Sequence, residues 1–487
     1  MKSVYVLKIS VFLASAMLLI VISCNTTVNN ADLPNVILVN VDDLGWMDLG
    51  SKNPNLFHTP NIDRLKSEGL EFVNAYAGAA NCAPSRACLL SGQNTPRHGV
   101  YTVSPSTRGN TKTRKLIPVK NKAHLTDEVI TLPELFKKAG YTTANFGKWH
   151  VGEDPLTQGI DINVAGGKNG NPGKGGYFSP YNIPNITNGP EGEYLTDRLT
   201  SEAISFISDH KEENFFAYMP YYTVHTPLLP RPDLFESYQT NPIYQSKAQA
   251  KYAAMVHGLD QNIGRLLNAL DSLNLTENTM VIFTSDNGGI AAISSQAPAR
   301  AGKGSYFQGG LKVPFVVRWP GVTAQNVTTQ TPTVNLDIYA TFLDLFGITV
   351  EQPHDGVSIL PTLQGRTQDF SQRNLVWHFP IYLQNYKGYQ DEARDPLFRT
   401  RPGSVILQGK WKLHHYLEDD QYLLYDIEND PGETTDVASK NPLIAQKLIA
   451  ELNTWRKEQN APFDLKINEA YDADFERKMI AKKGDIK

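Results

Sequence analysis

The order of apolar and polar positions along the chain predicts strands that alternate with helices. An unbroken apolar run at 35–41 is typical of a strand buried on both faces of a parallel sheet. Shorter apolar runs predict further strands at 142–146, 215–219 and 280–284. Between them, apolar residues recur at helical spacing in two clear stripes, which are Leu199, Ala203, Phe206 and Ile207, and then Tyr252, Val256, Leu259, Ile263, Leu266 and Leu270. This alternation predicts an α/β fold with a mostly parallel sheet covered by helices on both faces.

The pattern changes after about residue 370, where strands follow one another without helices between them. These apolar runs lie at 375–378, 404–407, 411–414 and 422–425. The pair Gly409-Lys410 fits a hairpin turn between the second and the third run. One helix follows, opened by Asn441 and Pro442. We therefore predict a main domain at 33–370 and a smaller α+β domain with an antiparallel sheet at 371–487.

The first 23 residues have the pattern of an export signal. A positively charged start precedes an apolar run at 9–22, which is shorter than the ~20 residues of a membrane span. The run ends at Cys24, and this junction resembles the lipobox of bacterial lipoproteins, whose cysteine is lipidated. The resemblance implies a signal peptide at 1–23, a lipid anchor at Cys24, a flexible tether at 24–32 and export to the bacterial cell envelope. An ordinary signal peptide cleaved near a chance cysteine is the alternative.

Composition narrows the class of partner. The 487 residues include 46 Lys and Arg against 50 Asp and Glu, so the net charge is -4. A weakly acidic chain does not attract nucleic acid or anionic lipid headgroups. With only Cys24, Cys82 and Cys88, the chain cannot form a disulfide framework, so each cysteine needs its own explanation.

Two polar pairs follow predicted strands directly. Asp42 and Asp43 come after the strand at 35–41, and Asp286 and Asn287 come after the strand at 280–284. Open α/β folds place their sites at the carboxyl ends of such strands. Carboxylate and amide oxygens suit Ca²⁺ or Mg²⁺ rather than zinc. Taken alone, each pair is more often a turn or a helix cap, whereas the two together favour a metal site, with a turn or cap as the alternative.

A third cluster opens a predicted helix. Cys82 precedes Pro84, which fits a first helical turn, and Gly92 fits the residue just past the helix end. Arg86 lies four residues after Cys82, so both face the same side, where the helix dipole favours an anion. The alternative is a buried structural cysteine beside a surface arginine.

The pattern Cys82-x-Pro84-Ser85-Arg86-x-x-Leu89-x-Ser91-Gly92 resembles the signature of the sulfatases of the alkaline phosphatase superfamily, with Ser91 where Thr is usual. In that family the cysteine is oxidised to formylglycine (3-oxoalanine) by a formylglycine-generating enzyme that reads Cys-x-Pro-x-Arg. Gln308 and Lys312 stand where the family more often has Glu and Arg, at positions that touch no substrate. The resemblance runs from residue 35 to about 455, and its other motifs lie at 39–45, 59–65, 147–150, 225–227, 285–288, 302–304, 308–314, 319–321 and 425–433.

The resemblance implies an alkaline-phosphatase-like fold and a role for each matching residue. The implied ligands of one Ca²⁺, with Mg²⁺ less favoured, are Asp42, Asp43, Asp286, Asn287 and the modified Cys82. The implied catalytic groups are Arg86, Lys148, His150, His225 and Lys303. Hydrated formylglycine attacks sulfur and forms a covalent sulfo-enzyme. His150 resembles the base that then releases sulfate, and His225 with Lys303 resembles the pair that protonates the leaving oxygen.

The implied substrate is a sulfated carbohydrate, because the segment 159–197 resembles that of sulfatases from polysaccharide-degrading bacteria. A polysaccharide or oligosaccharide of algal type, such as ulvan or carrageenan, is expected. We expect a substrate rim contributed by the C-terminal domain, with Trp377, His378 and Arg399, and with Arg394 or Arg401 as further anion contacts; an exposed loop without function is the alternative. The rival functions are a formylglycine-dependent phosphodiester or phosphonate monoester hydrolase and a non-catalytic glycan-binding lipoprotein.

Overall fold

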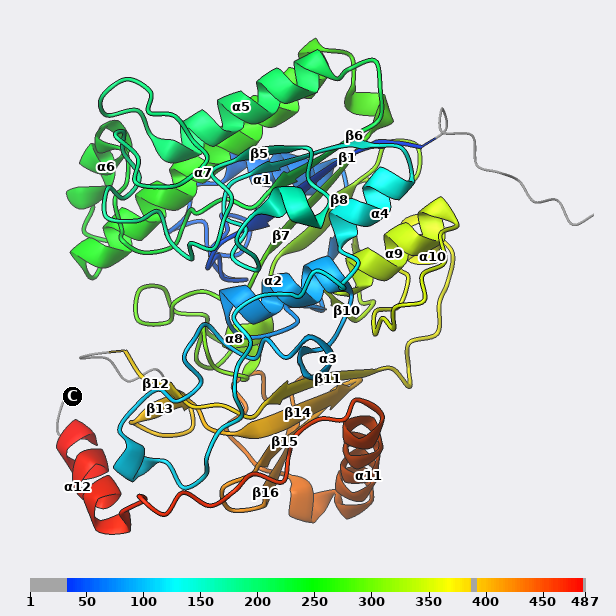
Figure 1. Cartoon of the computed structure of the whole chain (residues 1–487). Coiled ribbons are helices and arrows are strands. Elements are labelled where there is room, and N and C mark those ends of the chain that lie inside the picture. Colours follow the sequence, from blue (N-terminus) through cyan, green and yellow to red (C-terminus); the bar gives the residue numbers. More distant parts are fainter. Residues whose placement is uncertain (1–32, 387–391, 485–487) are drawn as a thin grey trace, which may run out of the picture.

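The computed structural model describes residues 33–386 and 392–484 (Figure 1). The predicted signal peptide at 1–23 and the predicted tether at 24–32, with Cys24, lie outside the described residues. Within the described ranges, no helix has both the length and the apolar character needed to cross a membrane.

One large mixed sheet forms the centre of the molecule. Its strand order is β5-β4-β6-β1-β7-β8-β2-β9. The strands from β5 to β7 are parallel, whereas β8 runs antiparallel to both of its neighbours. In this order the bounds are Ile162–Val164, Thr142–Phe146, Phe215–Met219, Asn35–Val41, Thr279–Ser285, Phe315–Arg318, Leu70–Phe72 and Val327–Thr329. The prediction of a mostly parallel sheet is confirmed.

Helices cover both faces of this sheet (Figure 1). Ile37, Val39 and Val41 of β1 pack toward α1, α5 and α7, while Val36 and Leu38 pack toward α2, α4 and α9. Because β1 has no solvent-exposed face, its residues are mostly apolar. The helices are α1 (Pro60–Ser67), α2 (Cys82–Ser91), α3 (Thr95–His98), α4 (Leu132–Lys138), α5 (Leu195–Asp209), α6 (Pro232–Gln239), α7 (Lys247–Ser272), α8 (Gln308–Leu311), α9 (Asp337–Phe346) and α10 (Leu360–Leu363).

A second, antiparallel sheet lies at the carboxyl-terminal end of the chain. Its order is β11 (Asn374–Phe379), β14 (Gly403–Gln408), β15 (Trp411–Tyr416) and β16 (Gln421–Asp426). The predicted turn is present, with Gly409 at φ 56 between β14 and β15. Leu448 and Leu452 of α11 (Pro442–Glu458) pack on one face, and the main domain covers the other. The predicted antiparallel sheet is confirmed, while the boundary at 370 stays a prediction.

Several short elements complete the described chain. They are β3 (Ala75–Tyr76) with β10 (Thr333–Val334), β12 (Leu383–Gln384) with β13 (Phe398–Thr400), α12 (Ala473–Gly484), and the 3-10 turns η2 (Thr111–Thr113), η3 (Pro155–Gln158), η4 (Thr276–Asn278) and η5 (Ala438–Lys440). The pair β12–β13 forms a separate two-stranded sheet that the sequence pattern does not predict, because each strand has only two or three residues.

Candidate active site

The carboxyl ends of two neighbouring strands bring acidic side chains together. β1 and β7 pair in parallel with Val41 opposite Ser285, so Asp42 and Asp286 follow adjacent strand ends. Asp43 donates its main-chain N–H to Asp286 Oδ1 at 3.2 Å. All three carboxyl groups are fully buried. Two motifs that are 243 residues apart thus form one acidic cluster.

Asn287 adds an amide oxygen to this cluster. Its Nδ2 donates to Asp43 Oδ1 at 2.8 Å and to the carbonyl of Gly288 at 2.9 Å. Glycine is required at 288, because a Cβ there would lie 2.0 Å from the carbonyl oxygen of Gly309. The close approach of these loops fixes the side chain of Asn287 beside the carboxylates.

Cys82 is the first residue of α2 and brings its thiol to the cluster from this helix. Its Sγ and carboxylate oxygens of Asp42, Asp43 and Asp286 all lie within 4.8 Å of one another. Burial, and then the negative charge of Asp42, raise the pKa of Cys82 to about 12. An unmodified thiol here stays protonated at neutral pH and is a weak nucleophile.

The donor set fits a hard divalent cation. Asp42 Oδ1 and Asn287 Oδ1 are buried and have no hydrogen-bond partner among the described residues. Burial raises the pKa of Asp42 to about 7, and Asp286 and Asp43 add to the rise although Lys148 opposes it. Clustered oxygen ligands of this kind are the ones that Ca²⁺ and Mg²⁺ prefer. A cation bound here would satisfy both orphaned oxygens and relieve the carboxylate repulsion.

Three buried cations face the three carboxylates. The pairs are Arg86 with Asp286 at 2.8 Å, Lys148 with Asp42 at 2.6 Å, and Lys303 with Asp43 at 2.7 Å. Arg86 Nη1 donates to the carbonyl of Lys148 at 2.6 Å, but its Nη2 is buried and has no hydrogen-bond acceptor in the described part of the chain. Three positive charges against three negative charges leave the set neutral, so a divalent cation brings it to +2. That charge suits an anionic ligand.

His150 is held as a neutral imidazole at the edge of the cluster. Its backbone adopts φ 64, and its N–H donates to the carbonyl of Gly167 at 2.9 Å. Burial, followed by the positive charges of Lys148 and Arg86, holds the pKa of His150 well below its usual value. Its Nδ1 has no partner among the described residues, so this atom is available to accept a proton.

His225 lies beside Asp43. Its Nε2 is 3.7 Å from Asp43 Oδ2, and its Nδ1 lies 2.6 Å from the carbonyl of Thr226. Burial and then Lys303 lower the pKa of His225 to about 3. The structure thus places near one another all the residues for which the sequence predicts catalytic or metal-binding roles, and those roles stay predictions.

A buried network that the sequence does not reveal positions the loop after β1. Asp48 Oδ2 accepts from the N–H of Gly45 at 2.8 Å and from the hydroxyl of Tyr252 at 2.6 Å. The same hydroxyl reaches the carbonyl of Asp43 at 3.1 Å. Tyr252 is predicted only as part of an apolar helical stripe, because its partner is 204 residues away in sequence. The network holds the main chain of Asp43, whose carboxylate belongs to the cluster.

Replacing Tyr252 by phenylalanine is therefore expected to weaken metal binding as well as stability. The buried Asp48 carboxylate loses a donor, which costs about 1–3 kcal/mol of unfolding free energy, and the affinity for Ca²⁺ falls by roughly 10-fold. Thermal unfolding and calorimetric Ca²⁺ titration measure the two effects. Tyr244→Phe is the matched control, because its hydroxyl donates to the carbonyl of Leu56 instead. Unchanged Ca²⁺ affinity in Tyr252→Phe contradicts the positioning role.

Two residues expected at the substrate rim are buried instead. Trp377 is 2% exposed and its Nε1 donates to the carbonyl of Ala77 at 2.8 Å. His378 is 1% exposed, with Nδ1 2.7 Å from Ser404 Oγ. Both faces of β11 are covered, so neighbouring side chains that point to opposite faces are both enclosed. The prediction that Trp377 and His378 contact substrate is wrong.

The three arginines of the expected rim have different surroundings. Arg401 is buried in ion pairs with Asp395, Glu418 and Glu476, and Arg394 pairs with Asp419, so these two are structural. Arg399 differs, because its Nη1 donates to the carbonyl of Lys303 at 2.8 Å. Of the three, Arg399 is the one that adjoins the cluster.

Cys88 has a partner that the sequence does not indicate. Its Sγ lies 3.5 Å from Nε2 of His98, and both residues are buried. Burial lowers the pKa of His98 to about 3, so the contact is between neutral groups. Cys88 is therefore a packed core residue outside the acidic cluster.

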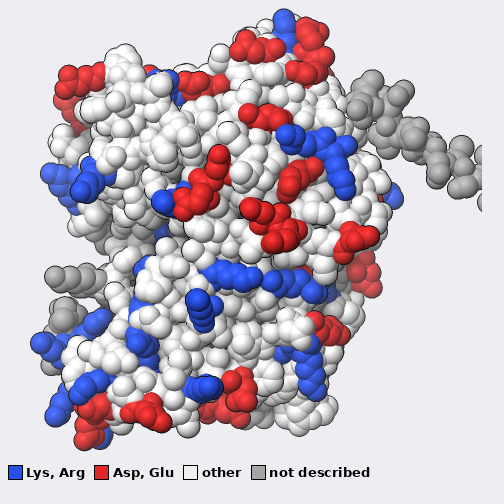
Figure 2. All heavy atoms as spheres, in the orientation of Figure 1, with Lys and Arg blue, Asp and Glu red and all other residues white. Residues whose placement is uncertain are grey.

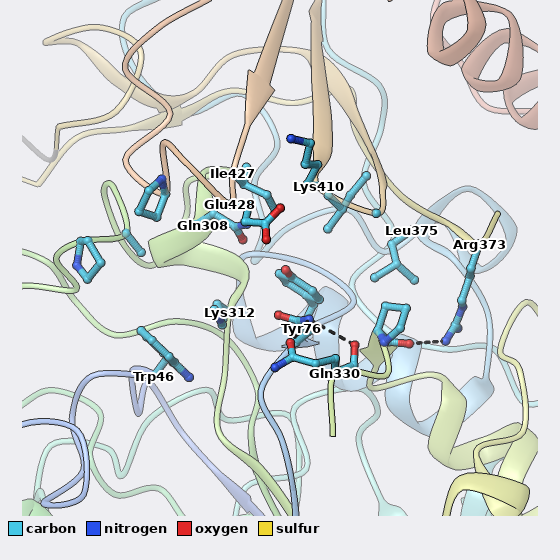
Figure 3. Close-up of a pocket in the computed structure, with 17 residues that line it drawn as sticks. Trp46, Tyr76, Gln308, Lys312, Gln330, Arg373, Leu375, Lys410, Ile427 and Glu428 are labelled. Atoms are coloured by element: carbon cyan, nitrogen blue, oxygen red, sulfur yellow. Dashed lines mark hydrogen bonds between the residues drawn. The ribbon is translucent and has the colours of Figure 1, made fainter. Parts of the chain in front are cut away.

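A cavity of about 410 Å³ opens where the main domain meets the C-terminal sheet (Figure 3). Gln308 and Lys312, the two departures from the family pattern, both line it. The ammonium of Lys312 lies 4.2 Å from the ring centre of Trp46. None of the residues that line this cavity belongs to the acidic cluster, and their predicted lack of contact with substrate stays a prediction.

Similarity to known proteins extends over nearly the whole chain. The family model described as "Sulfatase" matches residues 34–348, and the one described as "N-sulphoglucosamine sulphohydrolase, C-terminal" matches residues 302–459. A sulfatase of Formosa agariphila is 35% identical over 88% of this chain and 90% of its own. Human N-acetylgalactosamine-6-sulfatase is 34% identical over 69% of this chain and 67% of its own. The crystal structure of Ps i-CgsB in complex with k-i-k-neocarrahexaose has a TM-score of 0.70 and 29% identity, covering 87% of this chain and 92% of that one.

Proposed function

The chain belongs to the sulfatase family, and we propose that it hydrolyses sulfate esters of a polyanionic glycan with residue 82 in the formylglycine form. The observation that carries the proposal is the position of Cys82, at the start of α2 and among three carboxylates. A thiol with a pKa of about 12 stays protonated at neutral pH and is a weak nucleophile. Oxidation to an aldehyde gives the same position an electrophilic carbon that water can add to.

We propose Ca²⁺ as the resident metal, held by Asp42, Asp43, Asp286, Asn287 and residue 82. When bound, the cation supplies positive charge that lets an anionic nucleophile approach an anionic sulfate. Mg²⁺ is the less favoured alternative, because it demands stricter octahedral geometry than this crowded set offers. The oxygen donors and the two orphaned acceptors support this assignment.

The other buried side chains supply binding and proton transfer. Once formed and hydrated, the aldehyde offers two hydroxyl groups on one carbon, one to take over the sulfate and one whose deprotonation releases it. Arg86 Nη2, without a partner, and the ammonium groups of Lys148 and Lys303 are positioned to hold sulfate oxygens. His150 Nδ1 is neutral and accepts the proton of the second hydroxyl. His225 and Lys303, which both lie beside Asp43, protonate the leaving oxygen in this proposal.

Glycan substrates fit the relatives better than small aryl esters do. One similar protein is named for a sulfated amino sugar, N-acetylgalactosamine 6-sulfate. Another was crystallised in complex with k-i-k-neocarrahexaose. We therefore propose a sulfated polysaccharide or oligosaccharide, of algal type such as carrageenan or ulvan. We further propose that a formylglycine-generating enzyme matures Cys82, and that the chain is exported and anchored by lipid at Cys24 in a bacterial envelope.

Mass spectrometry of the peptide that contains residue 82 tests the modification. Protein from the native host is expected to carry an aldehyde that reacts with a hydrazide probe, whereas Arg86→Ala is expected to keep the thiol because the recognition sequence is broken. A wholly unmodified cysteine in active protein contradicts the proposal. Assaying 4-methylumbelliferyl sulfate beside the corresponding phosphodiester and phosphonate separates the rival hydrolases, and strong preference for phosphorus esters overturns the choice of sulfate. Absence of all three activities, together with absence of sulfate release from sulfated oligosaccharides, favours the non-catalytic glycan-binding rival.

A further inference from the structure

A loop of the main domain meets the small β12–β13 sheet at the edge of the acidic cluster. The N–H of Gly109 donates to the side-chain oxygen of Gln384 at 2.7 Å. The carbonyl of Gln384 accepts from Arg399 Nε at 3.1 Å, and Arg399 Nη1 reaches the carbonyl of Lys303. Arg108, next to Gly109, and Arg399 therefore lie on adjoining segments beside the loop that carries Lys303.

The hydrogen bonds that both guanidinium groups make to the described residues go to neutral carbonyl oxygens. Arg108 Nη2 donates to the carbonyls of Val103 and Ser104, at 3.2 Å each, and Arg399 donates to the two carbonyls named above. In the described part of the chain, no carboxylate lies within 4 Å of either group, in contrast to the ion-paired Arg394 and Arg401. Both side chains are partly or mostly enclosed, and Arg399 is only 8% exposed.

The two arginines disfavour each other in the absence of an anion. Burial, followed by the positive charge of Arg399, lowers the pKa of Arg108. The guanidinium plane of Arg399 is fixed, because it stacks on Tyr386 with 3.8 Å to the ring centre. A fixed guanidinium with free N–H groups is the side chain best suited to bidentate binding of sulfate or carboxylate.

Basic side chains are frequent on the half of the molecule that holds the C-terminal subdomain (Figure 2). In Figure 2, Lys and Arg side chains gather in the lower half of this face, where the loop that precedes α4 and the C-terminal subdomain lie, whereas Asp and Glu are more frequent over the helices of the upper half. An excess of positive charge on this half of the molecule attracts a polyanion.

We propose that Arg108 and Arg399 form a second anion subsite, which binds a further sulfate or carboxylate group of the glycan whose sulfate ester is cleaved at residue 82. This inference rests on the proposed function and deepens it. The subsite selects chains with more than one acidic group, because the second anion neutralises two guanidinium charges that no described carboxylate pairs with. Lys303 connects the acidic cluster with the proposed subsite, since its side chain belongs to the cluster and its carbonyl accepts a hydrogen bond from Arg399.

Matched substrates test the subsite. The substrates are κ- and ι-carrageenan oligosaccharides, which differ by one sulfate per repeat, and N-acetylgalactosamine 6-sulfate with and without a neighbouring glucuronate. The wild-type protein is expected to prefer the member with the extra anion in one of the pairs. Arg108→Gln is expected to reduce that preference by about 10- to 100-fold, chiefly through KM. A reduced preference in the first pair identifies a sulfate subsite, and in the second pair a carboxylate subsite.

Two further variants make the result decisive. Arg394→Gln, an arginine paired with Asp419, is expected to leave the preference unchanged. Arg399→Gln is expected to abolish the preference and to lower kcat as well, because it releases the carbonyl of Lys303. Equal preference in wild type and Arg108→Gln, or no preference by the wild type in either pair, overturns the subsite.

The proposed function is tested separately by hydrolysis of 4-methylumbelliferyl sulfate, because this ester has no second anionic group for the subsite to bind. If that ester and both pairs are uncleaved, calorimetric binding of the same oligosaccharides to Cys82→Ser, with and without Arg108→Gln, replaces the kinetic ratio. Equal affinities of these two proteins for every oligosaccharide then overturn the subsite.

Discussion

Replacing Cys82 by serine is expected to lower kcat/KM for sulfate esters by roughly 10⁴-fold or more. A serine hydroxyl at the start of α2 has no second hydroxyl on the same carbon, so a sulfate transferred to it is not released. The fold is expected to persist, because the residue is replaced by one of similar size in contact with Asp43, and the unfolding free energy should change by about 1 kcal/mol. Steady-state kinetics and thermal unfolding measure both quantities.

Cys88→Ser provides the control for this variant. It lies six residues further along the same helix and contacts His98 rather than the carboxylates. This substitution is expected to reduce stability and to preserve both turnover and the aldehyde at residue 82. Turnover by Cys82→Ser within 10-fold of wild type would falsify the proposed nucleophile.

Removing the divalent cation is expected to eliminate sulfate binding together with activity. Above the pKa of Asp42 the three carboxylates and three cations balance, so the metal-free site then has no excess positive charge for an anion. With Ca²⁺ present at about 100 times its dissociation constant, the folded state gains about 2.7 kcal/mol. Calorimetric titration of inorganic sulfate into Cys82→Ser, before and after chelation, should show at least about a 100-fold loss of affinity that Ca²⁺ restores.

Two aspartate variants identify the source of this effect. Asp42→Asn removes a carboxylate of the cluster and is expected to abolish the Ca²⁺-dependent rise in melting temperature. Asp260→Asn is the control, because Asp260 is a carboxyl whose pKa burial also raises, to about 6, but which accepts from Asn61 and Ile62. Sulfate affinity that survives chelation contradicts the charge argument.

The sequence is most informative where one local pattern determines both structure and chemistry. The run that ends at Val41 predicts β1 because a strand with two covered faces is mostly apolar, and it thereby also places Asp42 at a strand end. The helix from Cys82 is predicted equally well, since Gly92 adopts the left-handed conformation expected just past its end. Local rules suffice for these elements.

Contacts between segments that are far apart in the sequence cannot be predicted from such local patterns. Nothing in the pattern connects Tyr252 to Asp48, and the hydrogen bond from Gly109 to Gln384 spans 275 residues. The error at Trp377 and His378 has a related cause, because an aromatic-rich strand looks the same in sequence whether its second face is solvent or another domain.

The β12–β13 pair has a consequence for how such proteins diversify. These strands form a sheet of their own, outside both the large mixed sheet and the antiparallel sheet of the C-terminal subdomain. Insertions or substitutions there leave the backbone hydrogen bonds of the two larger sheets untouched. A gene lineage can therefore vary this sheet without rebuilding the two larger ones, except where Arg399 holds the carbonyl of Lys303 and so ties the sheet to the reaction centre.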